Sequence, residues 1–313
     1  MKIVVYGVGG VGGYFGGKLA AAGFNTTFIA RGAHLEAIKE NGLEVKSIYG
    51  DFLVKPAHAT SDINQVSESD LILLATKNWQ VTEVSSELKK VIHDNTVILP
   101  LQNGVNATEK LIEVIPAKNV LSGLCKIISF IESPGKIWHK AFHPQVIFGE
   151  QDNSKSDRIK EIKEIFDRAG FDNTIPDNIQ LEQWRKFLFI VTISGIGALT
   201  RMEIGINRSD SGVREIMKQT AVEIKQLANA KGIALADTDI ARTFEAIDKQ
   251  AGNTTASMQR DIMEGKPSEL DDFNGYVVKE SIKYGLDAPV NTFIYNCLKP
   301  MEELARKRQT PMK

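Results

Sequence analysis

The chain has 313 residues, of which 42% are hydrophobic and 25% are charged, a globular composition that excludes a disordered or fibrous protein. Lys and Arg number 38 against 39 Asp and Glu, so the formal net charge is −1 and nothing indicates nucleic acid or a membrane surface as a partner. Two cysteines are too few for a zinc cluster, and no apolar run reaches the ~20 residues that a membrane-spanning helix needs. We therefore expect a cytoplasmic protein of two domains with no metal, either a monomer or a homodimer.

The first strand and helix of the chain flank a glycine motif. Residues 2–6 form a β-branched run typical of a buried parallel strand, residues 14–22 fit a helix, and residues 26–30 fit a second strand. The motif G-x-G-x-x-G lies between the first strand and the helix, which is the context in which it binds a dinucleotide. Its first glycine permits the tight turn, the second lets a pyrophosphate approach, and the third lets helix and strand pack closely. A glycine-rich surface turn is the alternative. The residues of the motif are Gly7, Val8, Gly9, Gly10, Val11 and Gly12.

The residue that follows the second strand indicates which dinucleotide binds. An NAD site places Asp or Glu about 20 residues past the glycines, where it accepts a hydrogen bond from the ribose 2′-hydroxyl. Here Arg31 occupies that position, and no carboxylate lies between Phe28 and Ala33. A guanidinium matches a 2′-phosphate in charge and in its forked donors. We therefore expect NADP(H) rather than NAD(H), with a solvated surface arginine as the alternative.

Strands and helices alternate as far as Pro176. Buried parallel strands are expected over residues 71–75, 96–101 and 145–149, and helices over residues 81–92, 108–115 and 156–169. We predict that residues 1–176 form an α/β Rossmann domain with a doubly wound, mostly parallel sheet. Helices are then expected over residues 180–200, 212–231, 237–248, 270–284 and 291–306. Residues 177–313 are predicted to form an all-α substrate and catalytic domain.

Two polar loops follow strands of the predicted sheet. Ligands of an open α/β sheet bind beyond the carboxyl ends of its strands. Lys77 lies in T-K-N-W-Q at 76–80, and Asn103 lies in Q-N-G at 102–104. A lysine can meet a phosphate or carboxylate, and an asparagine offers both a donor and an acceptor. Loop solvation and turn formation explain both residues equally well.

Polar residues also mark the predicted helical domain. Lys186 lies in W-R-K at 184–186 among aromatic and apolar neighbours, surroundings that disfavour the charged form of an amine. A lysine on a helix more often lies on a solvated face, so its surroundings alone do not assign it. Polar stretches at 257–261 and 268–276 precede another helix, and a helix start near Ser268 is the plain explanation of the second. The tract 194–201 is glycine-rich for a helix, a composition that permits close packing or, alternatively, reshapes the pocket.

In their order along the chain, these motifs resemble the ketopantoate reductase family (2-dehydropantoate 2-reductases). The similarity runs from residue 1 to about residue 300. It implies NADPH-dependent reduction of a 2-oxo acid, with 2-dehydropantoate to pantoate in pantothenate biosynthesis as the leading candidate, in a cleft between a Rossmann domain and a helical domain. The matching segments are G-V-G-G-V-G at 7–12, Arg31, T-K-N-W-Q at 76–80, Q-N-G at 102–104, P-G-K-I-W-H at 134–139, V-I-F-G-E at 146–150, W-R-K at 184–186, S-M at 257–258 and S-E-L-D-D-F-N-G-Y at 268–276.

The resemblance implies cofactor-binding roles for residues of the first domain. Gly7 to Gly12 would hold the pyrophosphate, and Arg31 would hold the 2′-phosphate. Lys77 and Asn103 would line the cofactor side of the cleft, and Asn103 would also contact the substrate.

It also implies catalytic and substrate-binding roles in the second domain. Lys186 would be the proton donor, Ser257 a substrate-binding serine, and Glu269 a cleft carboxylate serving both catalysis and the cofactor. A cationic Lys186 can polarise a carbonyl and then supply the proton that reduction requires. Nothing in this chemistry requires a metal.

Three positions depart from the family pattern. Four and eight residues after Lys186, where the pantothenate-pathway enzymes have asparagines, the chain has Ile190 and Ser194, and Thr254 replaces a further asparagine. We still expect Ser194 and Thr254 to line the substrate site. An isoleucine in place of a donor leaves a buried substrate hydroxyl unpaired, so a different 2-oxo acid is an open alternative. A 3-hydroxy acid dehydrogenase-like enzyme and a catalytically silent dinucleotide-binding protein are the other two.

Overall fold

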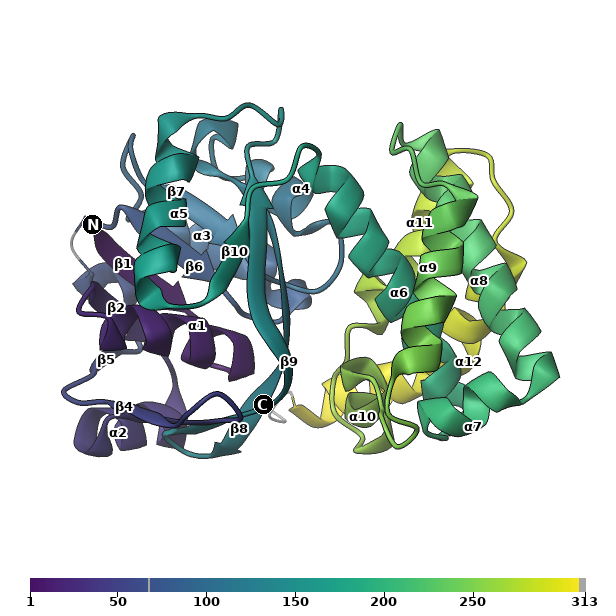
Figure 1. Cartoon of the computed structure of the whole chain (residues 1–313), viewed down its shortest axis with the longest axis horizontal. Coiled ribbons are helices and arrows are strands. Elements are labelled where there is room, and N and C mark those ends of the chain that lie inside the picture. Colours follow the sequence, from purple (N-terminus) through teal and green to yellow (C-terminus); the bar gives the residue numbers. More distant parts are fainter. Residues whose placement is uncertain (67, 310–313) are drawn as a thin grey trace. The chain divides into compact units, whose positions relative to one another are not determined.

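The computed structural model describes residues 1–66 and 68–309 (Figure 1). The chain divides into two compact units, Met1–Gln180 and Leu181–Lys313. The division falls within α6 (Ile179–Thr200), a few residues after the predicted domain boundary at residues 176 and 177.

A five-stranded parallel sheet forms the centre of the first unit, in the order β5-β2-β1-β6-β7. Its strands alternate with helices along the chain, which confirms the predicted doubly wound α/β fold. The strands are β1 (Lys2–Tyr6), β2 (Asn25–Ile29), β5 (His58–Thr60), β6 (Leu71–Leu74) and β7 (Val97–Pro100). The helices are α1 (Gly10–Ala21), α2 (Gly32–Asn41), η1 (Ile63–Gln65), η2 (Asn78–Gln80), α3 (Val81–Leu88), α4 (Ala107–Ile112), η3 (Ala117–Asn119) and α5 (Asp157–Ala169).

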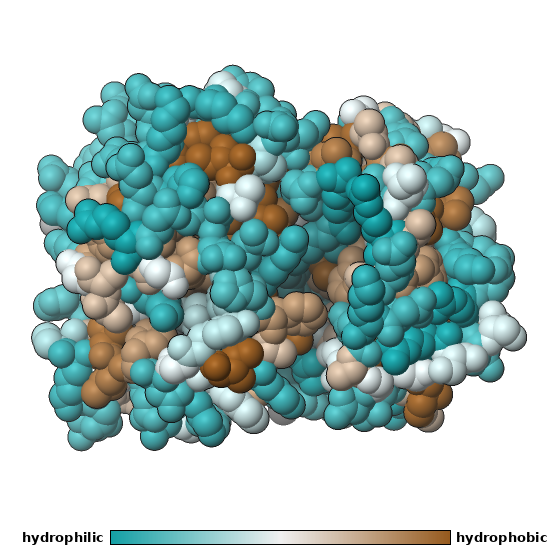
Figure 2. All heavy atoms as spheres, viewed as in Figure 1, coloured by the Kyte–Doolittle hydropathy of each residue, from teal (hydrophilic) through white to brown (hydrophobic). Residues whose placement is uncertain are grey.

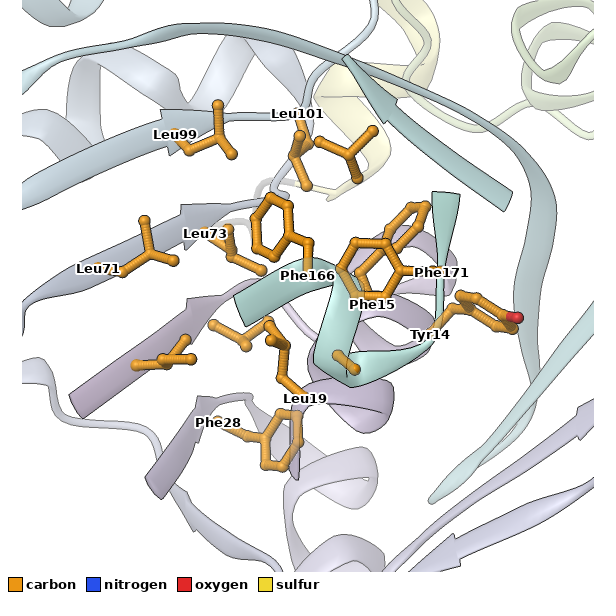
Figure 3. Packing of buried hydrophobic residues seen from close by; sticks show 14 of the residues in the cluster. Tyr14, Phe15, Leu19, Phe28, Leu71, Leu73, Leu99, Leu101, Phe166 and Phe171 are labelled. Carbon is orange, nitrogen blue, oxygen red and sulfur yellow. The ribbon is translucent and has the colours of Figure 1, made fainter. Parts of the chain in front are cut away.

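Alternation along the strands divides the core between the two faces of this sheet. In β1, Ile3 and Val5 join the cluster that packs against α1 and α5, while Val4 and Tyr6 join the cluster beneath α3 and α4. Figure 3 shows part of the first cluster, including Leu19, Phe28, Leu71, Leu73 and Leu99. The ring of Phe171 contacts those of Phe15 and Phe166 there, with centroid distances of 5.0 Å and 4.9 Å.

A second, mixed sheet of the first unit was not predicted. The expected strand at 145–149 is only the end of β9, which pairs antiparallel with β8 along most of its length. Continuous apolar runs indicate buried strands, whereas β8 after Cys125 and β9 before Val146 contain no run of consecutive buried residues. The strands of this sheet are β3 (Leu43–Ser47), β4 (Phe52–Val54), β8 (Ser122–Ser133), β9 (Lys136–Gly149) and β10 (Asp172–Thr174).

The second unit is helical, as predicted, and its described residues contain no strand. Two short helices, α7 and α10, were missed because each is too short to show a clear periodicity. The helix expected over 270–284 is interrupted at Phe273, whose φ of −104° and ψ of −101° are not helical. The helices after α6 are α7 (Ile204–Ser209), α8 (Ser211–Ala230), α9 (Asp237–Lys249), α10 (Ser257–Met263), η4 (Leu270–Asp272), α11 (Asn274–Lys283) and α12 (Pro289–Gln309).

Among the described residues, no helix combines the length and the apolar character that crossing a membrane requires. The face drawn in Figure 2 is mostly hydrophilic, with its apolar side chains in separate patches.

Candidate functional site

The predicted cofactor residues of the first unit follow the ends of four neighbouring strands. Tyr6 of β1 is level with Ile29 of β2 and with Leu74 of β6, and Leu74 is level with Pro100 of β7. In the sheet, β1 has β2 as its neighbour on one side and β6 on the other. The strand order therefore reverses direction at β1, and the segment after β1 lies at the topological switch point of the sheet. The segments that leave this one edge contain Gly7 to Gly12, Arg31, Lys77 and Asn103.

The glycine turn has the close approaches that its sequence predicts. Gly7 has a φ of +97°, and a Cβ atom added there would lie 2.9 Å from the backbone of Ala75 and Thr76. A Cβ atom on Gly12 would lie 2.0 Å from the carbonyl oxygen of Gly7. A Cβ atom on Gly9, the N-cap of α1, would meet no atom within 4 Å. The turn is therefore tight on its inner side and open over Gly9.

The other residues of the motif face the protein. A Cβ atom on Gly10 would lie 2.1 Å from the carbonyl oxygen of Ser129, so β8 of the second sheet lies directly against the first turn of α1. Val8 is buried, and Val11 packs against the larger core cluster. Sequence reasoning could not find the contact with Ser129, because it depends on the hairpin that was missed.

Three buried polar atoms near this edge have no hydrogen-bond partner in the structure: Thr76 Oγ1, Gln102 Oε1 and Ser129 Oγ. Thr76 contacts Gly7, and the amide nitrogen of Gln102 donates to the carbonyl of Leu74, 3.0 Å away. An unsatisfied buried polar atom costs about 1–3 kcal/mol, so these atoms favour a polar ligand that would complete their bonding. Together with the space over Gly9, they fit a dinucleotide. None of the three was predicted from the sequence.

Arg31, at the N-cap of α2, lies beside a carboxylate that sequence reasoning did not anticipate. Its Nη2 atom is 3.6 Å from Oε1 of Glu87 in α3, and its side chain is 61% exposed. The other carboxylate oxygen accepts a hydrogen bond from the hydroxyl of Tyr6. Burial, followed by the hydrogen bond to Glu87, raises the pKa of Tyr6, so its hydroxyl stays protonated as a donor.

Buried amides join the two predicted polar loops. Asn78 Nδ2 donates to Asn106 Oδ1 at 2.6 Å, which holds the loop after β6 against the loop after β7. Lys77 Nζ lies 5.6 Å from the centroid of the Trp79 ring, a cation–π distance. The side chains of Lys77 and Asn103 are both partly exposed.

In the second unit, the elements that carry Lys186 and Glu269 pack together. Lys186 lies on α6 and is partly buried, and the ring of its neighbour Phe187 lies 6.2 Å from Phe273 and 5.9 Å from Tyr276 between centroids. Glu269 is the N-cap of η4, is buried, and accepts a backbone hydrogen bond from Phe273 at 2.9 Å. These aromatic contacts bring the segment around Glu269 against the start of α6.

Hydrogen bonds to a carboxylate of the last helix fix the residue before Glu269. The buried carboxylate of Glu302 accepts hydrogen bonds from the backbone nitrogen of Ser268 at 2.9 Å and from its hydroxyl at 2.5 Å. Arg306 lies 2.7 Å from the same carboxylate. Glu302 is 34 residues from Ser268 in the sequence, so no local motif predicts this contact.

Two of the positions that depart from the family pattern interact with each other. The hydroxyl of Ser194 is buried and donates to the carbonyl oxygen of Ile190 at 2.5 Å, so its hydrogen is used within its own helix. The next residue, Gly195, allows a close approach, because a Cβ atom there would lie 2.7 Å from Oδ1 of the buried Asn274. The predicted close packing of the glycine-rich tract is thus confirmed at this residue.

Thr254 and Ser257 lie at the start of α10. Ser257 is its first residue, and both side chains are partly buried. The carbonyl of Thr254 accepts a hydrogen bond from Ile204 at 3.0 Å. A Cβ atom on Gly197 of α6 would lie 2.4 Å from Oε1 of Gln259, so α10 packs against the end of α6. Lys186, Ser194, Ser257 and Glu269 therefore come from elements that contact one another within the second unit.

Two models of one protein family match the chain, one in each unit. A family model described as ketopantoate reductase PanE/ApbA matches residues 3–153, and the model of its C-terminal part matches residues 178–302. The chain belongs to the ketopantoate reductase family. It is therefore an oxidoreductase of the class that acts on CH–OH groups, as the resemblance implied.

Relatives of the ketopantoate reductase family match the chain over nearly its whole length. The uncharacterized oxidoreductase YkpB of Bacillus subtilis is 28% identical and covers 96% of this chain and 99% of its own. A 2-dehydropantoate 2-reductase of Pyrococcus horikoshii is also 28% identical, over 97% of this chain and 98% of its own. The crystal structure of 2-dehydropantoate 2-reductase from Geobacter metallireducens superposes with a TM-score of 0.90 at 26% identity, over 96% of this chain and 99% of that one.

Family membership supports reduction of a 2-oxo acid with a nicotinamide dinucleotide. The roles of individual residues, the choice of dinucleotide and the substrate stay predictions. In the described part of the chain, no three His, Cys, Asp or Glu side chains are grouped to hold a metal ion.

Proposed function

We propose that this ketopantoate reductase family member reduces a 2-oxo acid to a 2-hydroxy acid with NADPH, and that 2-dehydropantoate is its leading candidate substrate. The observation that carries the proposal is the glycine turn at the switch point of the sheet, open over Gly9 and flanked by three unpartnered buried polar atoms. Arg31 at the end of β2 supports the 2′-phosphorylated dinucleotide.

The first unit would hold the cofactor. The backbone amides at the N-terminus of α1 suit the pyrophosphate, because the first turn of α1 has no acidic residue and no side-chain cap. The amide of Gly7 already donates to the carbonyl of Ile29 at 3.2 Å, so Gly7 would serve the site by shaping the turn. Arg31 would bind the 2′-phosphate, and Lys77 and Asn103 would bind nearer the reactive ring. When bound, the reduced nicotinamide supplies a hydride to the carbonyl carbon of the substrate.

The second unit would supply the acid chemistry. Lys186 would donate a hydrogen bond to the carbonyl oxygen and then transfer its proton there as negative charge develops. Glu269, positioned by the hydrogen bonds that Glu302 accepts from the preceding residue, would orient the ammonium group of Lys186 and contact the ribose of the cofactor. Ser257 would donate to the substrate carboxylate, with Asn103, Ser194 and Thr254 as further polar contacts.

One observation favours a different 2-oxo acid as the substrate. The hydroxyl hydrogen of Ser194 is already used by the carbonyl of Ile190, and Ile190 offers no polar group. A substrate hydroxyl beside these two residues could donate to the oxygen of Ser194, but it would find no donor there and no polar atom on the side chain of Ile190, whereas an asparagine provides both a donor and an acceptor. A 2-oxo acid with an apolar group at that position would lose nothing.

The decisive experiment is a panel of 2-oxo acids assayed for NADPH oxidation, with NADH in parallel. The panel should contain 2-dehydropantoate, a branched aliphatic 2-oxo acid of similar size without the hydroxyl, and an aromatic 2-oxo acid. The highest kcat/KM with 2-dehydropantoate supports the leading candidate, and the highest value with an acid that lacks the hydroxyl supports the alternative. Turnover of a 3-hydroxy acid with NADP+, together with no turnover of any 2-oxo acid with NADPH, contradicts the reaction type. Tight NADPH binding with no turnover of any substrate indicates a binding protein.

A further inference from the structure

Glu87 has no part in the function proposed above, yet it lies beside the residue assigned to the 2′-phosphate. One of its carboxylate oxygens is 3.6 Å from the guanidinium of Arg31, and the other accepts a hydrogen bond from Tyr6. Its side chain is 35% exposed, so a ligand bound at Arg31 can reach it. The charge beside the predicted 2′ site is therefore that of an ion pair and not that of a lone arginine.

The carboxylate is the fixed partner of this pair. Tyr6 is 3% exposed and belongs to the core cluster beneath α3, so packing sets the position of its hydroxyl. A protonated buried donor holds one oxygen of Glu87 and leaves the other turned toward Arg31. Arg31, whose side chain is mostly exposed, is the partner that can reorient when a ligand arrives.

The two dinucleotides would meet this pair differently. A 2′-phosphate carries about −1.5 to −2 charges, so a carboxylate nearby repels it and competes with it for the guanidinium. A ribose 2′-hydroxyl is neutral and can donate to a carboxylate, which is the role that Asp or Glu has in NAD sites. Arg31 thus favours NADPH, and Glu87 opposes that preference.

We propose that Glu87 is a coenzyme-selectivity residue that reduces the preference of this protein for NADPH over NADH and lets NADH bind at the same site. The inference rests on the proposed function for the bound dinucleotide, but it concerns a residue outside the glycine motif and outside the polar loops. Glu87 selects between cofactors through the ion pair, and Tyr6 is its positioning residue.

The test measures binding without any oxo acid. Dissociation constants for NADPH, NADH, 2′,5′-ADP and 5′-ADP are compared in the wild type, in Glu87→Gln and in Glu87→Ala. The matched control is Glu83→Gln, which removes the same charge from an exposed residue one turn earlier on α3. We expect both Glu87 variants to bind NADPH and 2′,5′-ADP about three- to fivefold more tightly, because the repulsion is gone. NADH and 5′-ADP should bind equally or more weakly, and the control should change every constant by less than about twofold because exposed charges are screened.

The outcomes separate this inference from the proposed function. An unchanged ratio of NADPH to NADH affinity in both Glu87 variants overturns the inference and leaves the proposed reductase intact. A shifted ratio in a protein that reduces no 2-oxo acid supports the inference and overturns the reductase. A wild-type protein that binds neither dinucleotide overturns both.

Discussion

Lys186 precedes Phe187, whose ring packs against Phe273 and Tyr276. Core packing therefore fixes the backbone of Lys186, while its own side chain stays partly exposed. A partly exposed amine on a helix whose backbone is held by core packing suits a proton donor, because the packing limits where the amine can lie.

Lys186→Ala should lower kcat by about 10²–10⁴-fold, since it removes the group that donates a proton in the transition state. NADPH affinity should stay close to the wild-type value, because the predicted phosphate and glycine contacts lie in the first unit. Steady-state kinetics and an NADPH titration check the two quantities separately. Turnover close to that of the wild type would show that another group supplies the proton.

Ile190→Asn should raise kcat/KM for 2-dehydropantoate if the native substrate lacks the hydroxyl. The asparagine supplies a donor and an acceptor that Ile190 lacks, and a hydrogen bond to a buried hydroxyl is worth about 0.5–1.5 kcal/mol. Ile190→Leu is the matched control, because it keeps the apolar character and the volume. Efficient wild-type turnover together with no gain in Ile190→Asn would establish 2-dehydropantoate as a good substrate.

The turn between β1 and α1 depends on two different properties of its glycines. Gly9 faces open space, whereas Gly10 is pressed against the backbone of Ser129 in β8. The same turn thus provides a surface for a ligand and a packing contact with the second sheet.

Gly9→Ala and Gly10→Ala should therefore impair different properties, NADPH binding in the first and stability in the second. A Cβ atom on Gly10 would lie 2.1 Å from a carbonyl oxygen, so we expect Gly10→Ala to lower the free energy of unfolding by about 1–3 kcal/mol. Gly9 has an ordinary φ of −78°, and a Cβ atom there meets no other atom, so Gly9→Ala should lower the free energy of unfolding by less than about 1 kcal/mol. It should nevertheless weaken NADPH binding. Chemical denaturation and NADPH titration of both variants give the comparison. Full NADPH affinity in Gly9→Ala would mean that the dinucleotide does not lie along this turn.

Each unit contains a carboxylate whose ion pairs make stability depend on pH. Glu150, after β9, accepts hydrogen bonds from Arg158 at 2.5–2.6 Å and from Ser156 at 2.5 Å. Burial acts to raise the pKa of Glu150, but the bonds from Arg158 and Ser156 outweigh it and lower the pKa. Glu280, in α11, has a pKa that burial acts to raise and that the bonds from Lys231 and Lys283 lower.

A lowered pKa in the folded state means that the unfolded chain binds more protons in acid. The stabilisation from these carboxylates is therefore complete above their ordinary pKa of 4.5 and is lost as the pH falls below it. Glu150→Gln and Glu280→Gln should each reduce the loss of unfolding free energy between about pH 5 and pH 3. The control is Glu161→Gln, at an exposed residue of α5, which should leave that slope nearly unchanged. Slopes equal to the wild type in both test variants would exclude these pairs as the source of acid sensitivity.

Much of the architecture could be predicted from local patterns. Continuous apolar runs predicted the central strands, and helical periodicity predicted five helices of the second unit, because each pattern reports the burial of one element. The glycine spacing predicted the turn after β1, since its conformation depends on the residues of the turn itself. The ordered motifs also predicted the family, which the family models confirm.

The remaining features depend on contacts between residues far apart in the sequence. The second sheet required β9 to pair with β3 and β8, and the unpartnered hydroxyl of Ser129 reached the glycine turn only through that pairing. Glu87 came to Arg31 because α3 packs over the face of the sheet that contains Tyr6. The sequence thus determined the elements, the glycine turn and the family, whose signals are local or ordered along the chain. Only the tertiary structure decided which charges and which unsatisfied atoms meet beside that turn, because packing and register set those distances.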